Sequence, residues 1–109
     1  MIVAHPTSVN GIRFSVRDDK NKEVGRAYLY IMHNDLHENP FGLMEDVEIV
    51  ETHRGSGLGS RLVQEVIATA EEHHCYKLIA TSRHSRPKVH TLYERLGFTN
   101  HGVEFRIDF

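Results

Sequence analysis

The sequence contains only one cysteine, Cys75, which excludes a disulfide within the chain and fits a reducing compartment. Basic residues are not in excess, because 13 Lys and Arg stand against 15 Asp and Glu. Since a basic surplus is what displaces counterions from nucleic acid, we expect no nucleic-acid partner. No apolar run approaches the roughly 20 residues that span a bilayer, and the first residues lack the basic and apolar regions of a signal peptide. We therefore expect a soluble cytoplasmic protein with no membrane partner.

The length of 109 residues predicts a single domain over residues 1–109, large enough to form a core without disulfide or metal support. Nine histidines are many for this length and raise the question of a metal site. They are scattered through predicted loops and helix ends, and the neighbours His73 and His74 would point in different directions on a helix. A structural zinc site needs four convergent ligands. We therefore expect histidines at the surface or facing phosphate, and no metal.

The first half of the chain predicts three strands. Apolar and polar residues alternate over 12–16, and a polar turn at 18–22 separates this segment from an apolar-rich segment at 24–32. The short turn predicts that these two strands pair as a hairpin. A loop over 33–40 leads to a third strand over about 42–50.

The second half predicts helices that alternate with strands. Apolar residues at helical spacing follow Leu58 and predict a helix with one buried face. The apolar segment 77–81 predicts a buried strand parallel to the third. A second helix begins near Pro87 and ends at Gly97, and residues 103–109 alternate as in a strand. The fold class is therefore α/β, with a mixed central sheet and the element order β-β-β-α-β-α-β.

The segment between the third strand and the first helix carries the strongest chemical signal. It reads R-G-S-G-L-G-S from Arg54 to Ser60, with alternating glycines at 55, 57 and 59. Alternating glycines allow the backbone to approach a ligand closely and to direct several N–H groups toward one point. The helix N-terminus adds positive potential, and Arg54 and Arg61 add two charges. This segment predicts a phosphate cradle.

Two common phosphate-binding motifs do not fit the cradle. The string G-x-x-x-x-G-K-[ST] of a P-loop is missing. A dinucleotide fingerprint, G-x-G-x-x-G, fails at Ser60, which stands where the last glycine should be, although Arg83 could contact the 2′-phosphate of NADP. Only one βαβ unit is predicted, so a doubly wound dinucleotide-binding sheet cannot form.

A third motif, R-x-x-G-x-G, is filled by Arg54, Gly57 and Gly59, and L-Y-E-R-L-G-F follows at 92–98. The first motif lies at a predicted strand–loop–helix junction and the second at a helix–turn–strand junction. In this order and context, the two motifs resemble those of the GNAT superfamily of acyl-CoA-dependent N-acyltransferases. The resemblance covers roughly residues 9–109 and marks the chain as a short member. The segment L-M-E-D-V-E-I-V-E-T-H-R-G-S-G-L-G also resembles the diamine and polyamine N-acetyltransferases.

The resemblance implies how coenzyme A would bind. The loop amides and Arg54 would hold its pyrophosphate, and the third strand would pair with its pantetheine arm. His90 stands where family members often carry an asparagine that contacts the cofactor. The implied cofactor-binding residues are Val47, Glu48, Ile49, Arg54, Gly55, Ser56, Gly57, Leu58, Gly59, Ser60 and His90.

The resemblance also implies catalytic residues. Tyr93 takes the place of the tyrosine that protonates the departing thiolate of coenzyme A. Glu45 and Asp46 stand where a carboxylate often receives the proton of the amine, and strand alternation predicts that only one of them faces the site. A backbone N–H near Glu48 or Ile49 would stabilise the oxyanion. A basic cluster at Arg83, Arg86 and Lys88 is either solvated or binds the 3′-phosphate or an acidic acceptor.

The predicted function is N-acetyl transfer from acetyl-CoA, as co-substrate, to a primary amine by direct attack in a ternary complex. The alternatives are transfer of a longer acyl group and a non-catalytic acyl-CoA-binding or sensory module. Members of the family commonly have two helices between their first two strands, where this chain has only the turn at 18–22. That difference predicts an open acceptor groove for a small-molecule amine or a peptide or protein amine, or a groove completed by a second subunit in a homodimer. The sequence does not determine the acceptor.

Overall fold

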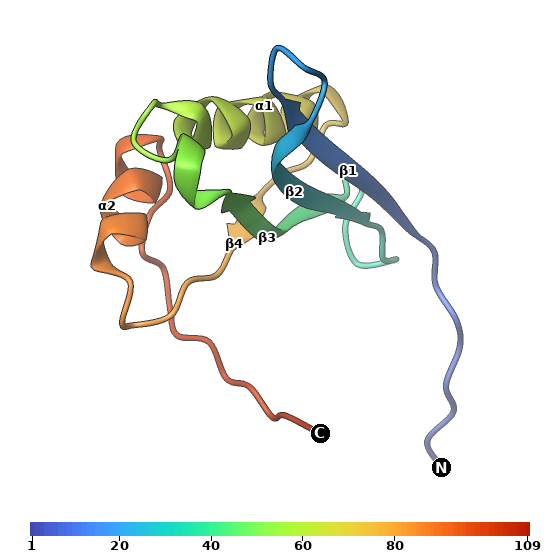
Figure 1. The fold of residues 1–109 in the computed structure, drawn as a ribbon. Coiled ribbons are helices and arrows are strands. Elements are labelled where there is room, and N and C mark those ends of the chain that lie inside the picture. Colours follow the sequence, from blue (N-terminus) through green and yellow to red (C-terminus); the bar gives the residue numbers. More distant parts are fainter.

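Four strands form one mixed sheet in the order β1-β2-β3-β4, and helix α1 lies across one face of it (Figure 1). The structure is a computed structural model that describes all 109 residues. Its elements are β1 (Val9–Arg17), β2 (Glu23–Met32), β3 (Phe41–Ile49), the 3₁₀ turn η1 (Glu51–His53), α1 (Leu58–Glu72), β4 (Leu78–Ala80) and α2 (Pro87–Arg95). The predicted α/β class and the order of its first six elements are confirmed. Neither helix has the length and apolar character that a membrane crossing requires.

Strands β1 and β2 form the predicted antiparallel hairpin. Its turn is closed by Asp18, whose Oδ1 accepts hydrogen bonds from the backbone N–H groups of Lys20 and Lys22, both at 2.9 Å. Asn21 adopts a φ of 62°, a conformation that asparagine tolerates better than most residues. The polar turn therefore uses its own side chains to reverse the chain, and no helix lies between the first two strands.

Strand β3 changes its pairing along its length. On β2 the single residue Ala27 lies opposite two residues of β3, Asp46 and Val47, which forms a β-bulge in which Asp46 has a φ of 52°. On its other side β3 pairs in parallel with β4, and this pairing ends at Met44 and Ala80. Beyond that point the two parallel strands separate.

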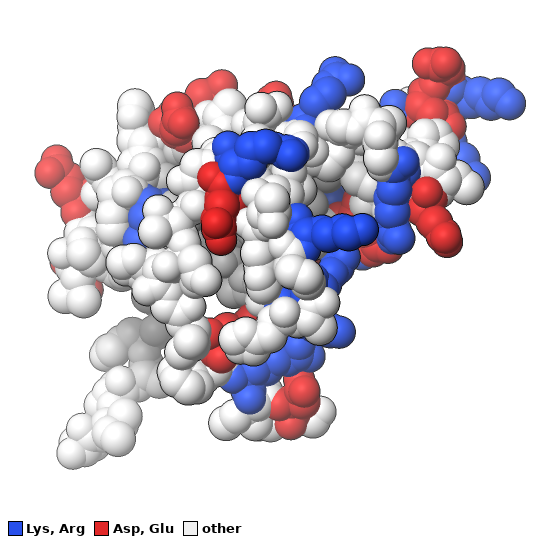
Figure 2. Space-filling model, turned by 90° about the vertical axis from the view of Figure 1, so that its left-hand side faces the viewer, with Lys and Arg blue, Asp and Glu red and all other residues white.

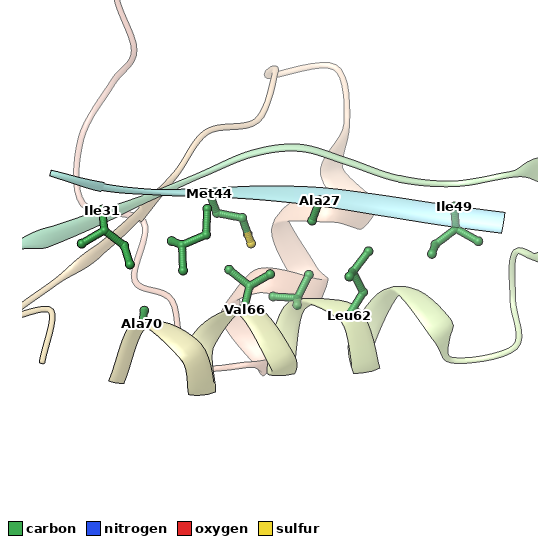
Figure 3. Packing of buried hydrophobic residues seen from close by; sticks show 9 residues of the cluster. Ala27, Ile31, Met44, Ile49, Leu62, Val66 and Ala70 are labelled. Carbon is green, nitrogen blue, oxygen red and sulfur yellow. The ribbon is translucent and has the colours of Figure 1, made fainter. Parts of the chain in front are cut away.

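The core lies between the sheet and α1. In Figure 3 the apolar side chains of the helix and those of the strands point toward one another. Each fully buried apolar side chain contributes roughly 1.5–3 kcal/mol relative to an exposed one, so this layer supplies most of the stabilisation. The buried cluster comprises Ala27, Leu29, Ile31, Met44 and Ile49 from the sheet and Leu62, Val63, Val66 and Ala70 from α1.

Two predictions about the end of the chain are wrong. Residues 103–109 do not form a strand; they are extended but have no strand partner, and strand propensity is expressed only when a neighbouring strand is present. Strand β4 is parallel to β3, as predicted, but it is not buried. It lies at the edge of the sheet, and Ile79 is 37% exposed.

Candidate active site

A cavity of about 1070 Å³ opens where β3 and β4 separate. Because β4 ends at Ala80, the side of β3 that would face it has no strand partner over Glu45–Ile49. A ligand can therefore lie along that strand as β4 would have done. The walls comprise Arg26, residues 45–49, Arg54, Gly55, Gly59, Thr81, Ser82, Arg83, Arg86, Lys88, Val89, Leu92, Tyr93, Glu104 and Arg106.

The loop after β3 presents six consecutive backbone donors. The N–H groups of residues 55–60 form no hydrogen bond within the protein. Gly57 is the N-cap of α1, and no side chain caps the helix. Unpaired amides at a helix N-terminus, together with the helix dipole, form a favourable environment for an anion. These unpaired amides are the donors that the predicted phosphate cradle would use, and the binding of phosphate by them stays a prediction.

The three glycines of the loop are needed for different reasons. Gly55 and Gly57 have φ values of 80° and 83°, which favour glycine for conformational reasons alone. Gly59 lies in the first turn of α1, and a Cβ atom there would meet nothing closer than Ile49 Cγ1 at 3.9 Å. The fold itself therefore tolerates a larger residue at 59, although glycine is unfavourable in a helix. Close approach of a ligand gives a reason for glycine at this position.

A second hollow of about 330 Å³ lies between the glycine loop and α2. Gly55 and Gly59 line both hollows, so the two meet along the loop. Lys88 and Arg95 line the second one, and Arg95 Nη2 donates to Ser60 Oγ at 3.0 Å. The sequence did not single out Arg95, although its seven-residue spacing from Lys88 places both on one face of a helix. Figure 2 views the side that carries α2 and the loop and shows Lys and Arg side chains gathered there among some acidic ones.

Arg54 connects the loop to the end of β3. Its Nε donates to the carbonyl oxygen of Ile49 at 2.8 Å, and its Nη2 lies 3.8 Å from Glu48 Oε1. Glu48 also pairs with Arg26 at 3.3 Å. Arg54 is therefore held at the cavity wall by one hydrogen bond and a weak ion pair.

The predicted catalytic residues line the same cavity. Burial raises the pKa of Tyr93, the charge of Glu45 raises it further, and the charge of Arg86 opposes both. Burial also raises the pKa of Glu45, with smaller contributions from the charges of Asp46 and Glu104. A phenol with a raised pKa stays protonated near neutral pH, and a carboxylate with a raised pKa is a stronger base than usual.

Strand alternation does not separate Glu45 from Asp46 as predicted. The bulge at Asp46 interrupts the alternation, and both residues line the cavity. Glu104 and Arg106, which the sequence did not single out, reach the same cavity from the last segment of the chain. Only the folded chain could reveal them, because neither residue belongs to a motif.

Three predicted cofactor contacts lie outside both hollows. Nε2 of His90 lies 2.8 Å from the carbonyl oxygen of Arg83 and so ties α2 to the loop after β4. Ser56 Oγ donates to the carbonyl oxygen of His53 at 2.8 Å, and Leu58 packs against the core. The backbone donors of Ser56 and Leu58 still belong to the cradle, whereas a contact from His90 to a cofactor stays a prediction.

No three His, Cys, Asp or Glu side chains lie close enough together to hold a metal ion. The residues at the cavity instead combine unpaired backbone donors, basic side chains, one half-buried phenol and four carboxylates. This set can bind an elongated phosphorylated ligand and can transfer protons beside it.

Comparison with known proteins points to one family. Residues 6–98 match the model of the Acetyltransferase (GNAT) family. The glucosamine 6-phosphate N-acetyltransferase of Trypanosoma brucei brucei is 37% identical over 68 residues, which are 62% of this chain and 44% of that protein. The enzyme of the same name from Candida albicans is 30% identical over 82 residues, which are 74% of this chain and 53% of that protein. The chain thus spans about half the length of these curated relatives.

A solved structure shares the fold. The crystal structure of a Trypanosoma brucei acetyltransferase superposes with a TM-score of 0.81 at 28% identity, covering 91% of this chain and 69% of that one. The relatives named above are not diamine or polyamine acetyltransferases. The finer resemblance to that branch therefore stays a prediction.

Proposed function

The chain belongs to the GNAT family of acetyltransferases, and from this premise we propose that it transfers an acetyl group from acetyl-CoA to a primary amine. The observation that carries the proposal is that two sets of backbone groups without hydrogen-bond partners lie next to each other. The six free amides of residues 55–60 adjoin the side of β3 that β4 leaves unpaired over Glu45–Ile49. One surface suits a diphosphate and the other suits an amide-containing arm, and coenzyme A carries both groups.

The residues present fit coenzyme A. Its pyrophosphate would accept hydrogen bonds from the loop amides, with positive charge from Arg54 nearby. Lys88 and Arg95 in the second hollow offer positive charge for its further phosphate. The pantetheine arm would pair with Val47, Glu48 and Ile49, as a strand would. The thioester would then lie at the end of the cavity that holds Glu45 and Tyr93.

The chemistry requires two proton transfers. The nitrogen of a neutral amine forms a bond to the thioester carbon, and the carbon–sulfur bond breaks with its electron pair leaving on sulfur. Glu45 takes the proton from the amine, directly or through water, and Tyr93 gives its proton to the departing sulfur. A backbone N–H near Glu48 or Ile49 stabilises the oxyanion that forms between these steps.

The acceptor class is a small-molecule amine. Glucosamine 6-phosphate, which appears in the names of the two curated relatives, is the first acceptor to test. The cavity offers Glu45 for an amine, and Arg83, Arg86 and Arg106 for a phosphate. A polyamine is the second, because the L-M-E-D-V-E segment resembles that branch of the family and four carboxylates, Glu45 and Asp46 among them, line the wall.

Calorimetric titration with acetyl-CoA tests the cradle. We expect Gly59→Ala to weaken binding by about 10-fold, because its methyl group occupies the space nearest the phosphates. Gly102→Ala is the matched control, since a Cβ there meets nothing within 4 Å and the residue lies outside both hollows. Equal affinity of wild type and Gly59→Ala would contradict the proposed cradle.

A thiol-release assay tests turnover with glucosamine 6-phosphate, spermidine, lysine peptides and simple amino acids. Release of coenzyme A that depends on one of these acceptors supports an acetyltransferase. Tight binding of acetyl-CoA with no release for any acceptor would instead identify a non-catalytic binding module. Faster release with succinyl-CoA or propionyl-CoA than with acetyl-CoA would identify transfer of a longer acyl group.

A further inference from the structure

One buried hydroxyl group has no hydrogen-bond partner, and it belongs to a residue of the cavity wall. Among the side chains that are not exposed, Ser82 Oγ is the only nitrogen or oxygen atom that is both shielded from water and unpaired. A buried hydroxyl without a partner is unfavourable, so folded proteins seldom keep one without a reason. Because Ser82 lines the cavity between β3 and β4, a ligand that enters this cavity can supply the missing partner.

Ser82 lies just beyond the point where the two parallel strands separate. Strand β4 ends at Ala80, opposite Met44 of β3, and the chain then leaves the sheet and passes to α2 (Figure 1). Two residues of extended chain span at most about 7 Å, so Ser82 stays close to the point of separation. It therefore belongs to the wall of the cavity that lies across from the unpaired side of β3 over Glu45–Ile49.

The short segment that carries Ser82 is held at both ends. At one end it continues from β4, which pairs with β3. At the other end the carbonyl oxygen of Arg83 accepts hydrogen bonds from the backbone N–H of Arg86 at 3.1 Å and from Nε2 of His90 at 2.8 Å. The backbone of Ser82 therefore has a defined position. A change of the χ1 rotamer moves a serine hydroxyl without moving the backbone, so this group can turn to a ligand in the cavity.

We propose that the hydroxyl group of Ser82 binds an amide of the pantetheine arm of coenzyme A. The inference rests on the proposed function, in which this arm lies along Val47, Glu48 and Ile49. The N–H and C=O groups of a trans secondary amide point in opposite directions. An amide that bonds β3 through one of these groups therefore directs the other group at the opposite wall. Ser82 lies on that wall, and its hydroxyl can donate to a C=O group or accept from an N–H group.

The neighbours of Ser82 are less suited to this contact. Thr81 and Arg83 are exposed, so water competes for their hydrogen bonds, and the charge of Arg83 suits a phosphate better than an amide. A hydrogen bond at a site shielded from water is stronger than one in solvent. The hydroxyl of Ser82 is therefore unfavourable in the free protein and favourable in the complex. This difference in sign separates a ligand contact from a purely structural role.

Calorimetric titration of Ser82→Ala tests the contact with two ligands, acetyl-CoA and 3′-phospho-ADP, which has the phosphates of coenzyme A but no arm. The variant is expected to bind acetyl-CoA about 5- to 10-fold more weakly, because one hydrogen bond is lost. It should bind 3′-phospho-ADP as the wild type does. Ser82→Cys keeps a side chain of similar shape but is a weak donor, so its affinities should follow those of Ser82→Ala. Ser85→Ala is the matched control, since Ser85 is exposed and lies outside both hollows.

Thermal unfolding without ligand gives a second measurement that does not depend on binding. Ser82→Ala removes an unpaired hydroxyl, so its melting temperature should equal that of the wild type or exceed it by up to about 4 °C. A melting temperature clearly below that of Ser85→Ala would reveal a partner in the free protein and overturn the inference. Unchanged affinity of Ser82→Ala for acetyl-CoA, or an equal loss for both ligands, would overturn it while leaving the proposed function intact. A wild-type protein that binds no acetyl-CoA would overturn both.

Discussion

The two faces of the sheet differ in how completely they are closed. On the face covered by α1, Leu29, Val63 and Val66 have no exposed surface. On the opposite face, Arg13, Tyr28 and Glu45 lie in one row across β1, β2 and β3, and none of them is fully buried. The covered face provides the stability of the fold, and the other face, which leads to the cavity at Glu45, holds the groups available for chemistry.

The ion pairs of the open face add little to stability. Arg13 pairs with Glu23, and this hydrogen-bonded contact lowers the pKa of Glu23 to about 2. Both side chains are well exposed to water, where such pairs are screened and contribute little. Substitutions on the two faces should therefore separate stability from activity.

The largest effect is expected from Leu29→Ala on the covered face. Leu29 is fully buried against α1, so the substitution leaves a cavity and should lower the free energy of unfolding by about 2–5 kcal/mol. Chemical denaturation measures the change. Leu36→Ala is the matched control, because Leu36 is 82% exposed in the loop after β2. An equal loss of unfolding free energy in both variants would contradict the distinction between the buried face and the exposed loop.

Tyr93→Phe should affect turnover much more than stability. The proposed acid loses its proton but keeps its ring, which packs beside Phe98 at a centroid distance of 5.2 Å. We expect turnover to fall by about 100-fold or more while the affinity for acetyl-CoA barely changes. Tyr76→Phe, at an exposed tyrosine outside the cavity, is the control. Full activity of Tyr93→Phe would exclude Tyr93 as the acid.

The smallest effect is expected from Glu45→Gln. This variant should lower turnover, because the proposed base is lost, but it should slightly raise the free energy of unfolding. Burial raises the pKa of Glu45, so the folded state holds this proton more tightly than the unfolded state does. The stability that Glu45 contributes is therefore present at low pH and is lost as the pH rises through the raised pKa. Glutamine has no such dependence, and the variant should be more stable near neutral pH.

The gain from Glu45→Gln is expected to stay below about 1 kcal/mol, because the carboxylate is only partly buried and solvent screens it. Thermal unfolding of wild type and variant between pH 3 and pH 8 measures it. The two curves should converge at low pH and separate as the pH rises. A variant less stable than wild type at neutral pH would show that the carboxylate is stabilised by a partner rather than strained by burial.

The sequence predicted the covered face better than the cavity. Leu62, Val63, Val66 and Ala70 recur at helical spacing, and a buried face of α1 follows from that spacing alone. The polar turn at 18–22 and the positive φ values of Gly55 and Gly57 also follow from local chemistry. Each of these features depends on residues that are neighbours in the chain.

The missed features depend on pairing between distant segments. The bulge at Asp46 exists because Ala27 of β2 pairs opposite two residues, and nothing in the residues near Asp46 indicates it. Apolar and polar residues do alternate over 103–109, but a strand also requires a partner, and this segment has none within the chain. Glu104 and Arg106 reach the cavity only because of the tertiary fold, and neither belongs to a motif.

Helix α1 connects the covered face of the sheet with the cavity. Its N-terminal end presents the free amides, and its apolar side packs against the sheet. An anion that docks at residues 55–60 meets donors that are already oriented, so little entropy is lost in ordering them. Binding is thereby linked to folding, because the unfolded chain has no such arrangement of donors. A tight ligand at this end should raise the melting temperature of the whole molecule, which makes a thermal-shift screen a direct way to search for it.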